Sequence, residues 1–175
     1  MRSRSPSPVV AAARAASNAS TERRAHFVNS MATAAAIIAR ADGRSDPIER
    51  REFIACARRS LSRAAVRRWN VSVLFDERVG ELERNPNRTA DLLSVLDVVA
   101  GTPRAWIVLR TAERVATVDG DVGEAEITSL AAIRRSLGIP SGIRERFAAC
   151  ILWGFPSTGQ SHRHLCGWIA DRKGQ

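Results

Sequence analysis

Two stretches of the chain decide its fold: residues 41–49 read ADGRSDPIE, and residues 118–126 read VDGDVGEAE. Both contain an aspartate and a glycine followed, after five further residues, by a glutamate. Each stretch follows an apolar segment with helical spacing and opens another such segment. The two stretches therefore predict an internal pseudo-repeat of helix, acidic loop and helix.

Apolar residues on either side of these stretches recur at three- and four-residue steps, which is typical of buried helix faces. The first such segment starts at Thr21 and ends at the first Asp-Gly pair. Further helices are expected at residues 46–61, 62–82, 92–99, 103–118 and 124–137, with a short one after Pro140. No segment shows the alternation of a strand. The sequence predicts an all-α protein, a compact bundle of about seven helices.

Length and composition support one globular domain. The chain has 175 residues, of which 45% are hydrophobic and 26% charged, and no apolar run is long enough for a membrane span. Three widely spaced cysteines make no disulfide framework and favour a reducing, cytoplasmic setting. We expect a disordered basic leader at residues 1–20, a helical domain at 21–147, and a separate tail at 148–175.

The acidic loops have two interpretations that the spacing leaves open. Asp46, Pro47 and Glu49 match a helix start with a capping box, and Asp-Gly is common turn chemistry. Alternatively, the carboxylates converge on a hard divalent cation such as Ca²⁺ or Mg²⁺. The candidate ligands are Asp42, Asp46, Glu49, Asp119, Asp121, Glu124 and Glu126.

A simple EF-hand is excluded. The glycine-to-glutamate spacing fits such a loop, but its first and third positions would be Ile38 and Arg40 in one copy, and Val115 and Thr117 in the other. Because these residues are not the required oxygen ligands, each copy has only the second half of an EF-hand loop. The two loops would have to meet to gather enough oxygens for one ion.

The repeated motif resembles the TerB family of tellurite-resistance proteins, in which an apolar helix runs into A-D-G and then a helix-opening glutamate, twice along the chain. The ending at residues 137–140, LGIP, and the linker at residues 92–103 are similar to the family's as well. The resemblance covers roughly residues 26–147.

The resemblance implies a bundle of about seven helices with its carboxylates gathered as a cation site. Carried over by position, the ligands are Asp42, Glu49, Asp119 and Glu126, with the other three acids in support. It also implies a non-enzymatic role in tellurite and chemical-stress resistance. The expected location is cytoplasmic, at the inner face of the membrane if a membrane-embedded Ter-type protein is the partner.

A second hypothesis starts from the arginines. The net charge is +9, but residues 26–145 hold 18 arginines against 16 acidic residues, so most of the excess lies in the tails. Within the body, arginines concentrate between residues 50 and 68 on helical faces. Arg51, Arg58, Arg59, Arg63 and Arg67 are the candidates for contact with an anionic partner. The alternative function is therefore an interaction module for a protein, membrane surface or nucleic acid, with purely structural Asp-Gly loops.

Neither hypothesis is enzymatic. The sequence contains no nucleophile–histidine–acid order, phosphate-binding glycine loop or metalloprotease helix, and only three histidines. Aromatic residues make up 5% and tyrosine is absent, which argues against base stacking and specific nucleic-acid recognition.

Overall fold

The computed structural model describes residues 8–120 and 122–140, and all regular secondary structure in these ranges is helical, with no strand. The prediction of an all-α fold is confirmed. The α-helices are α1 (Pro8–Ala39), α2 (Pro47–Ser60), α3 (Arg63–Arg68), α4 (Val71–Arg84), α5 (Thr89–Ser94), α6 (Pro103–Ala116) and α7 (Glu124–Ser136). Two short 3-10 turns, η1 (Pro86–Arg88) and η2 (Asp97–Val99), flank α5.

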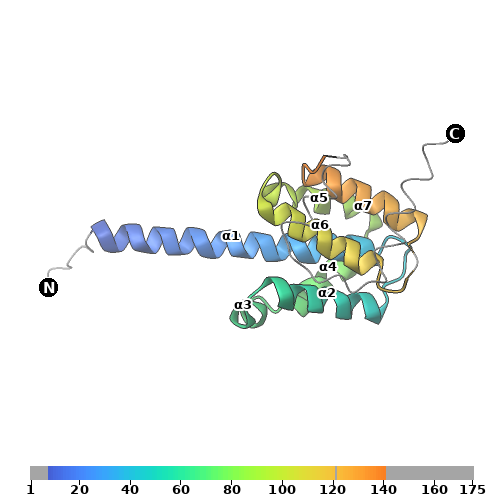
Figure 1. The fold of residues 1–175 in the computed structure, drawn as a ribbon, viewed down its shortest axis with the longest axis horizontal. Coiled ribbons are helices and arrows are strands. Elements are labelled where there is room, and N and C mark those ends of the chain that lie inside the picture. Colours follow the sequence, from blue (N-terminus) through green and yellow to red (C-terminus); the bar gives the residue numbers. More distant parts are fainter. Residues whose placement is uncertain (1–7, 121, 141–175) are drawn as a thin grey trace, which may run out of the picture.

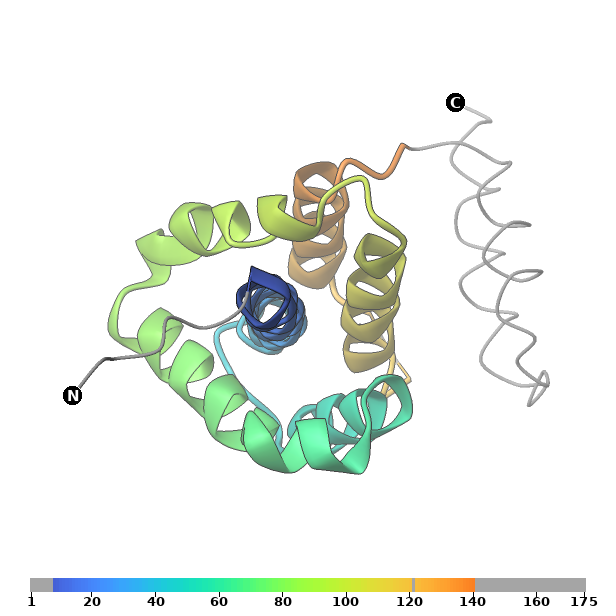
Figure 2. The same ribbon diagram turned by 90° about the vertical axis from the view of Figure 1, so that its left-hand side faces the viewer.

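Helix α1 forms the centre of the domain, and the other helices surround it (Figure 2). It contacts α2, α4, α5, α6 and α7. Every residue from Ser30 to Ala39 is buried, so this end of the helix is covered on all sides rather than along one stripe. A helix that is apolar all round belongs in a core, and its alanines let the neighbouring helices approach closely.

The first half of α1 projects from the bundle (Figure 1). The helix begins at Pro8 rather than at the expected Thr21, so residues 8–20 of the predicted disordered leader are helical. Proline suits a first helical turn, and the following segment is rich in alanine, the residue with the highest helix propensity. Residues 1–7 lie outside the described ranges.

The predicted helix at residues 62–82 is two helices, because the chain bends at Asn70. This residue adopts a left-handed backbone, with φ of 41°, which asparagine tolerates better than most residues. Similarly, the segment expected as one helix at 92–99 is α5 followed by η2. The short helix expected after Pro140 and the tail at 148–175 fall outside the described residues.

Contacts of α2 with α4 fix one side of the bundle. Phe53 and Phe75 are fully buried, and their rings stack with centroids 5.0 Å apart. Above them, the Arg50 guanidinium donates two hydrogen bonds to the Asp76 carboxylate, each 2.7 Å long. Aromatic stacking and a bidentate ion pair thus hold the same two helices together.

Glu52 joins α2 to α6. Its Oε1 accepts hydrogen bonds from Arg59 Nη2 at 2.7 Å and from Arg114 Nε at 3.0 Å. Burial alone would raise the pKa of Glu52, but the bonds from Arg114 and Arg59 outweigh it and hold that pKa below its ordinary value. Because Glu52 lies near the start of α2 and Arg114 near the end of α6, this contact brings the loop before α2 toward the loop after α6.

Within the described ranges, no helix combines the length and apolar character that crossing a membrane would require.

Candidate functional site

The first acidic loop, residues 40–46, leads from α1 into α2. Its turn contains Gly43 in the left-handed region, with φ of 86°, a conformation that favours glycine. Asp42 Oδ1 accepts a hydrogen bond from the Arg44 backbone N–H at 2.9 Å. Asp46 Oδ1 accepts one from the Ile48 N–H at 2.7 Å, and Glu49 Oε2 accepts one from the Asp46 N–H at 2.8 Å. The capping-box interpretation of this loop is confirmed.

The second acidic loop, residues 117–123, leads from α6 into α7 and repeats much of this geometry. Gly120 has φ of 92°, and Glu126 Oε2 accepts a hydrogen bond from the Gly123 N–H at 2.8 Å. Asp119 and Glu124 are exposed. The predicted ligand Asp121 lies outside the described residues. Each loop therefore has a left-handed glycine and, six residues later, a glutamate that caps the following helix.

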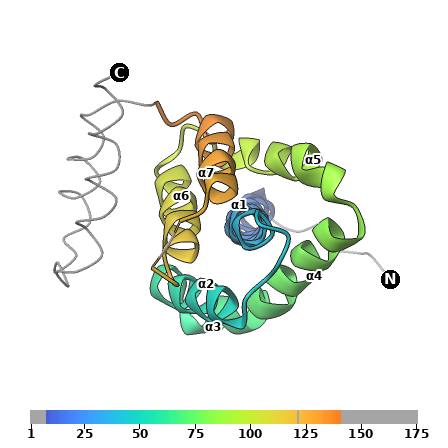
Figure 3. The same cartoon turned by 90° about the vertical axis from the view of Figure 1, so that its right-hand side faces the viewer.

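The two loops lie at the same end of the bundle, opposite the projecting half of α1 (Figures 1 and 3). Burial of Glu49 raises its pKa, and the negative charges of Glu126, Asp42 and Asp46 raise it further, against the opposing effect of the hydrogen bond from the Asp46 backbone. The charge of Glu126, from the other half of the pseudo-repeat, therefore reaches Glu49. The fold places the two loops that the sequence motif repeats at one end of the bundle.

The predicted ligands do not form a ready-made coordination cage. In residues 8–120 and 122–140, no group of three or more histidine, cysteine, aspartate or glutamate side chains is placed to hold a metal ion. One oxygen each of Glu49 and Glu126 is bonded to the backbone at the start of its own helix. An ion at this end would have to compete with those capping bonds or coordinate the carboxylates through water.

The five predicted arginines separate into two groups. Arg59 is used inside the fold, because its Nη2 lies 2.7 Å from Glu52 Oε1 and 3.1 Å from Cys56 Sγ. All five are exposed, but no ion pair is found within the described residues for the other four. Three of them, with Val66, line a groove of about 560 Å³ between the end of α2 and α3: Arg58, Arg63 and Arg67. We call these four lining residues the arginine groove. Arg51 is not among its described lining residues.

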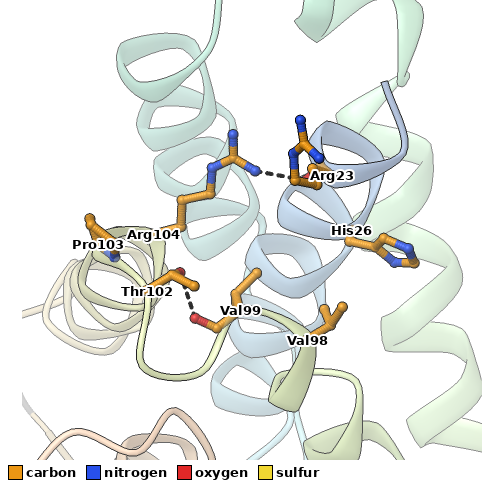
Figure 4. Close-up of a pocket in the computed structure, with 7 residues that line it drawn as sticks. All are labelled: Arg23, His26, Val98, Val99, Thr102, Pro103 and Arg104. Atoms are coloured by element: carbon orange, nitrogen blue, oxygen red, sulfur yellow. Dashed lines mark hydrogen bonds between the residues drawn. The ribbon is translucent and has the colours of Figure 1, made fainter. Parts of the chain in front are cut away.

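A second hollow, of about 310 Å³, lies where η2 and the start of α6 meet α1 (Figure 4). Arg104 reaches across it, donating a hydrogen bond from Nη1 to the Arg23 carbonyl at 2.9 Å and placing its guanidinium 5.3 Å from the centre of the Phe27 ring. Val98 on η2 is half exposed at its edge. Since the Arg104 guanidinium already contacts the Arg23 carbonyl and the Phe27 ring, we interpret this hollow as part of the packing between α1 and α6.

Sequence reasoning did not assign a role to Glu52, although it organises the contact between α2 and α6. The available signal was its isolation as the one acidic residue between Arg50 and Arg68. When a helix carries a single acidic residue among several arginines, that residue can accept hydrogen bonds from more than one guanidinium group.

Comparison of the chain with protein-family models, with curated proteins and with solved structures finds no match in any of the three. The likeness to the TerB family consequently rests on the repeated motif and its surroundings in this sequence.

Proposed function

We propose that this protein is a non-enzymatic, TerB-like module that takes up a divalent cation where its two acidic loops meet. The observation that carries the proposal is that the two acidic loops lie at the same end of the bundle, where the charge of Glu126 in one copy of the pseudo-repeat raises the pKa of Glu49 in the other. Folding holds these like charges near each other, together with Asp42 and Asp46. A divalent cation between the loops would replace their mutual repulsion by attraction.

The capping bonds set the character of such binding. Glu49 and Glu126 each keep one oxygen on a backbone N–H, and a cap of this kind contributes about 1 kcal/mol. A cation that displaced both caps would lose that stabilisation, so we expect modest affinity. Ca²⁺ tolerates irregular geometry and water ligands better than Mg²⁺, which demands near-ideal octahedral coordination. We therefore expect Ca²⁺ to bind more tightly than Mg²⁺.

The biological setting of the proposal comes from the resemblance. A TerB-like module would act in tellurite and chemical-stress resistance, in the cytoplasm, with a membrane-embedded Ter-type protein as its partner. The bound cation would make the end of the bundle that carries the acidic loops less negative and would thereby change its attraction for that partner. This part of the proposal depends on cation uptake and fails with it.

Isothermal titration calorimetry of the full chain with CaCl₂ and MgCl₂ tests the proposal. The variants Asp119→Asn and Glu126→Gln remove charge from the second loop. Glu77→Gln removes one charge from an exposed position on α4 and serves as the matched control. We expect Ca²⁺ binding that weakens at least severalfold in both loop variants and is unchanged in the control. Absence of binding, or equal binding by all four proteins, would overturn the proposal.

A further inference from the structure

The arginine groove lies at the opposite end of α2 from the acidic loops. Arg58 is in the last turn of α2, whereas Glu49 is in its first turn. Arg63 and Arg67 come from α3, which packs on α2 on the side where α1 projects (Figure 1). The groove is therefore a separate feature whose charge is opposite to that of the proposed cation site.

Its three arginines differ from the six in the described chain that form ion pairs with a carboxylate. Arg40, Arg50, Arg59, Arg78, Arg88 and Arg114 each have a carboxylate partner. No ion pair is found for Arg58, Arg63 or Arg67 within the described part of the chain, and all three side chains are exposed. Three guanidinium groups around one concave volume repel one another unless an anion lies between them. The groove is thus a positive concavity without a charge partner among the described residues.

The chemistry of the lining indicates the class of anion. A guanidinium presents a planar fork of N–H donors that matches two oxygens of a phosphoryl or carboxylate group. Three forks around about 560 Å³ suit an anion with several oxygen-bearing groups rather than a single small ion. Val66, the apolar member of the described lining, is half-buried, whereas the three arginines around it are exposed. We propose that the arginine groove binds a soluble anion that carries at least two linked phosphoryl groups.

Nucleic acid and membrane surfaces fit the groove less well. Trp69, the nearest aromatic residue in sequence, is half-buried and has the Arg68 guanidinium 5.4 Å from its ring centre, so it offers no free stacking platform. Stable membrane attachment combines electrostatic attraction with a second contribution, such as exposed apolar side chains beside the basic residues. The exposed large apolar residues of the described chain, Ile48, Val73 and Val98, are not among the residues that line the groove.

The rest of the chain supplies no obvious anion of its own. Residues 1–7 contain two arginines and no acidic residue, and residues 141–175 contain five basic residues against two acidic ones. Both segments are net positive, so neither complements the groove in overall charge. Charge complementarity therefore points to an external ligand.

The test measures binding of inorganic tripolyphosphate to the full chain by calorimetry, with EDTA present so that divalent cations make no contribution. Arg63→Ala and Arg67→Ala each remove one fork, and Arg63→Lys keeps the charge but removes the fork. Arg88→Ala is the control, because it removes the same charge from an exposed arginine paired with Asp91. Thermal unfolding of every variant confirms that it is folded.

We expect tripolyphosphate to bind at least tenfold more tightly than inorganic phosphate. Each alanine variant should weaken tripolyphosphate binding about tenfold or more, Arg63→Lys severalfold, and Arg88→Ala less than twofold. Binding should also fall as salt rises. Equal loss in Arg88→Ala and Arg63→Ala would overturn the proposal, since net charge would then explain binding.

Two further arms distinguish other anions. The same proteins are titrated with phosphatidylglycerol vesicles and with duplex DNA. Binding of either one that depends on Arg63 and is not displaced by tripolyphosphate would also overturn the proposal. These results are independent of cation binding at the acidic loops, because EDTA is present and the variants lie at the other end of α2.

Discussion

Replacing Glu49 with glutamine should stabilise the protein at neutral pH, although it removes a residue of the predicted cation site. The pKa of Glu49 is raised above its ordinary value of 4.5 by burial and by the charges of Glu126, Asp42 and Asp46. A raised pKa means that the folded protein binds a proton more readily than the unfolded chain. Stability therefore falls as the pH rises from 4.5 through the folded-state pKa, and at pH 7 the ionised carboxylate is a net liability.

The size of the effect follows from what glutamine keeps and removes. Its amide oxygen can still accept the hydrogen bond from the Asp46 N–H, with a loss of about 0.5 kcal/mol because the acceptor is no longer charged. In return, the substitution removes the cost of burying the Glu49 charge and the repulsion between that charge and three acidic residues. After solvent screening, the burial cost and each of the three repulsions amount to about a few tenths of a kcal/mol. We expect a net gain of about 0.5–1 kcal/mol at pH 7, or roughly 1–4 °C in Tm.

Urea unfolding at pH 4 and pH 7 measures this gain, with Glu77→Gln as control for the loss of one exposed charge. The advantage of Glu49→Gln should be present at pH 7 and nearly absent at pH 4. It should also shrink when Glu126 is already glutamine, because part of the repulsion is then gone. If Glu49→Gln were no more stable than the unmodified protein at pH 7, or gained equally with and without the Glu126 charge, the two loops would not be coupled in the way described.

Three other changes test the surrounding structure. Glu52→Gln should lower the free energy of unfolding by about 2 kcal/mol at pH 7, because two charged hydrogen bonds weaken. Since the pKa of Glu52 is lowered in the folded protein, this contribution should be lost as the pH falls below 4.5. Urea unfolding at several pH values measures the loss. Phe53→Ala should cost about 3–5 kcal/mol by leaving a cavity against Phe75, whereas equal stability in chemical denaturation would contradict the stacked core. Gly120→Ala should cost about 1 kcal/mol through backbone strain at its φ of 92°, and a stabilised variant in thermal unfolding would show that the turn is wrongly described.

The helical class and the first loop were predictable because their signals are local. Apolar spacing identifies helix faces within single segments, and Asp46, Pro47 and Glu49 form a capping signature that depends only on neighbouring residues. The structure confirms both. The bend at Asn70 was missed because the apolar stripe continues on both sides of it, and a single left-handed residue leaves that pattern intact.

The central position of α1 was not predictable from its pattern. Only part of its buried surface consists of large apolar residues, and the remainder is alanine, which occurs both in cores and on helix surfaces. The helical start at Pro8 was missed for a related reason, since an Arg-, Ser- and Ala-rich composition is shared by disordered leaders and by exposed helices. In both cases, the tertiary surroundings rather than the local residue spacing determine whether the segment is helical and whether it is buried.

The meeting of the two acidic loops could be hypothesised from the repeat but not located by it. The distance between the two loops depends on how α2 and α6 pack. The hydrogen bond from Arg114 to Glu52 holds these helices together across a separation of 62 residues in sequence. The arginine groove has the same origin. Its residues share helical faces in the sequence, but the concavity exists only because α3 turns away from the end of α2.

The most direct test of the central claim, that both loops share one cation, is an NMR titration of the full chain with CaCl₂ that follows the backbone amides of Gly43 and Gly120. These glycines occupy the same position in the two loops and provide one reporter for each. We expect both signals to shift with the same dissociation constant, and Glu126→Gln to weaken both responses together. A response confined to one glycine, two different dissociation constants, or no shift in either would contradict it.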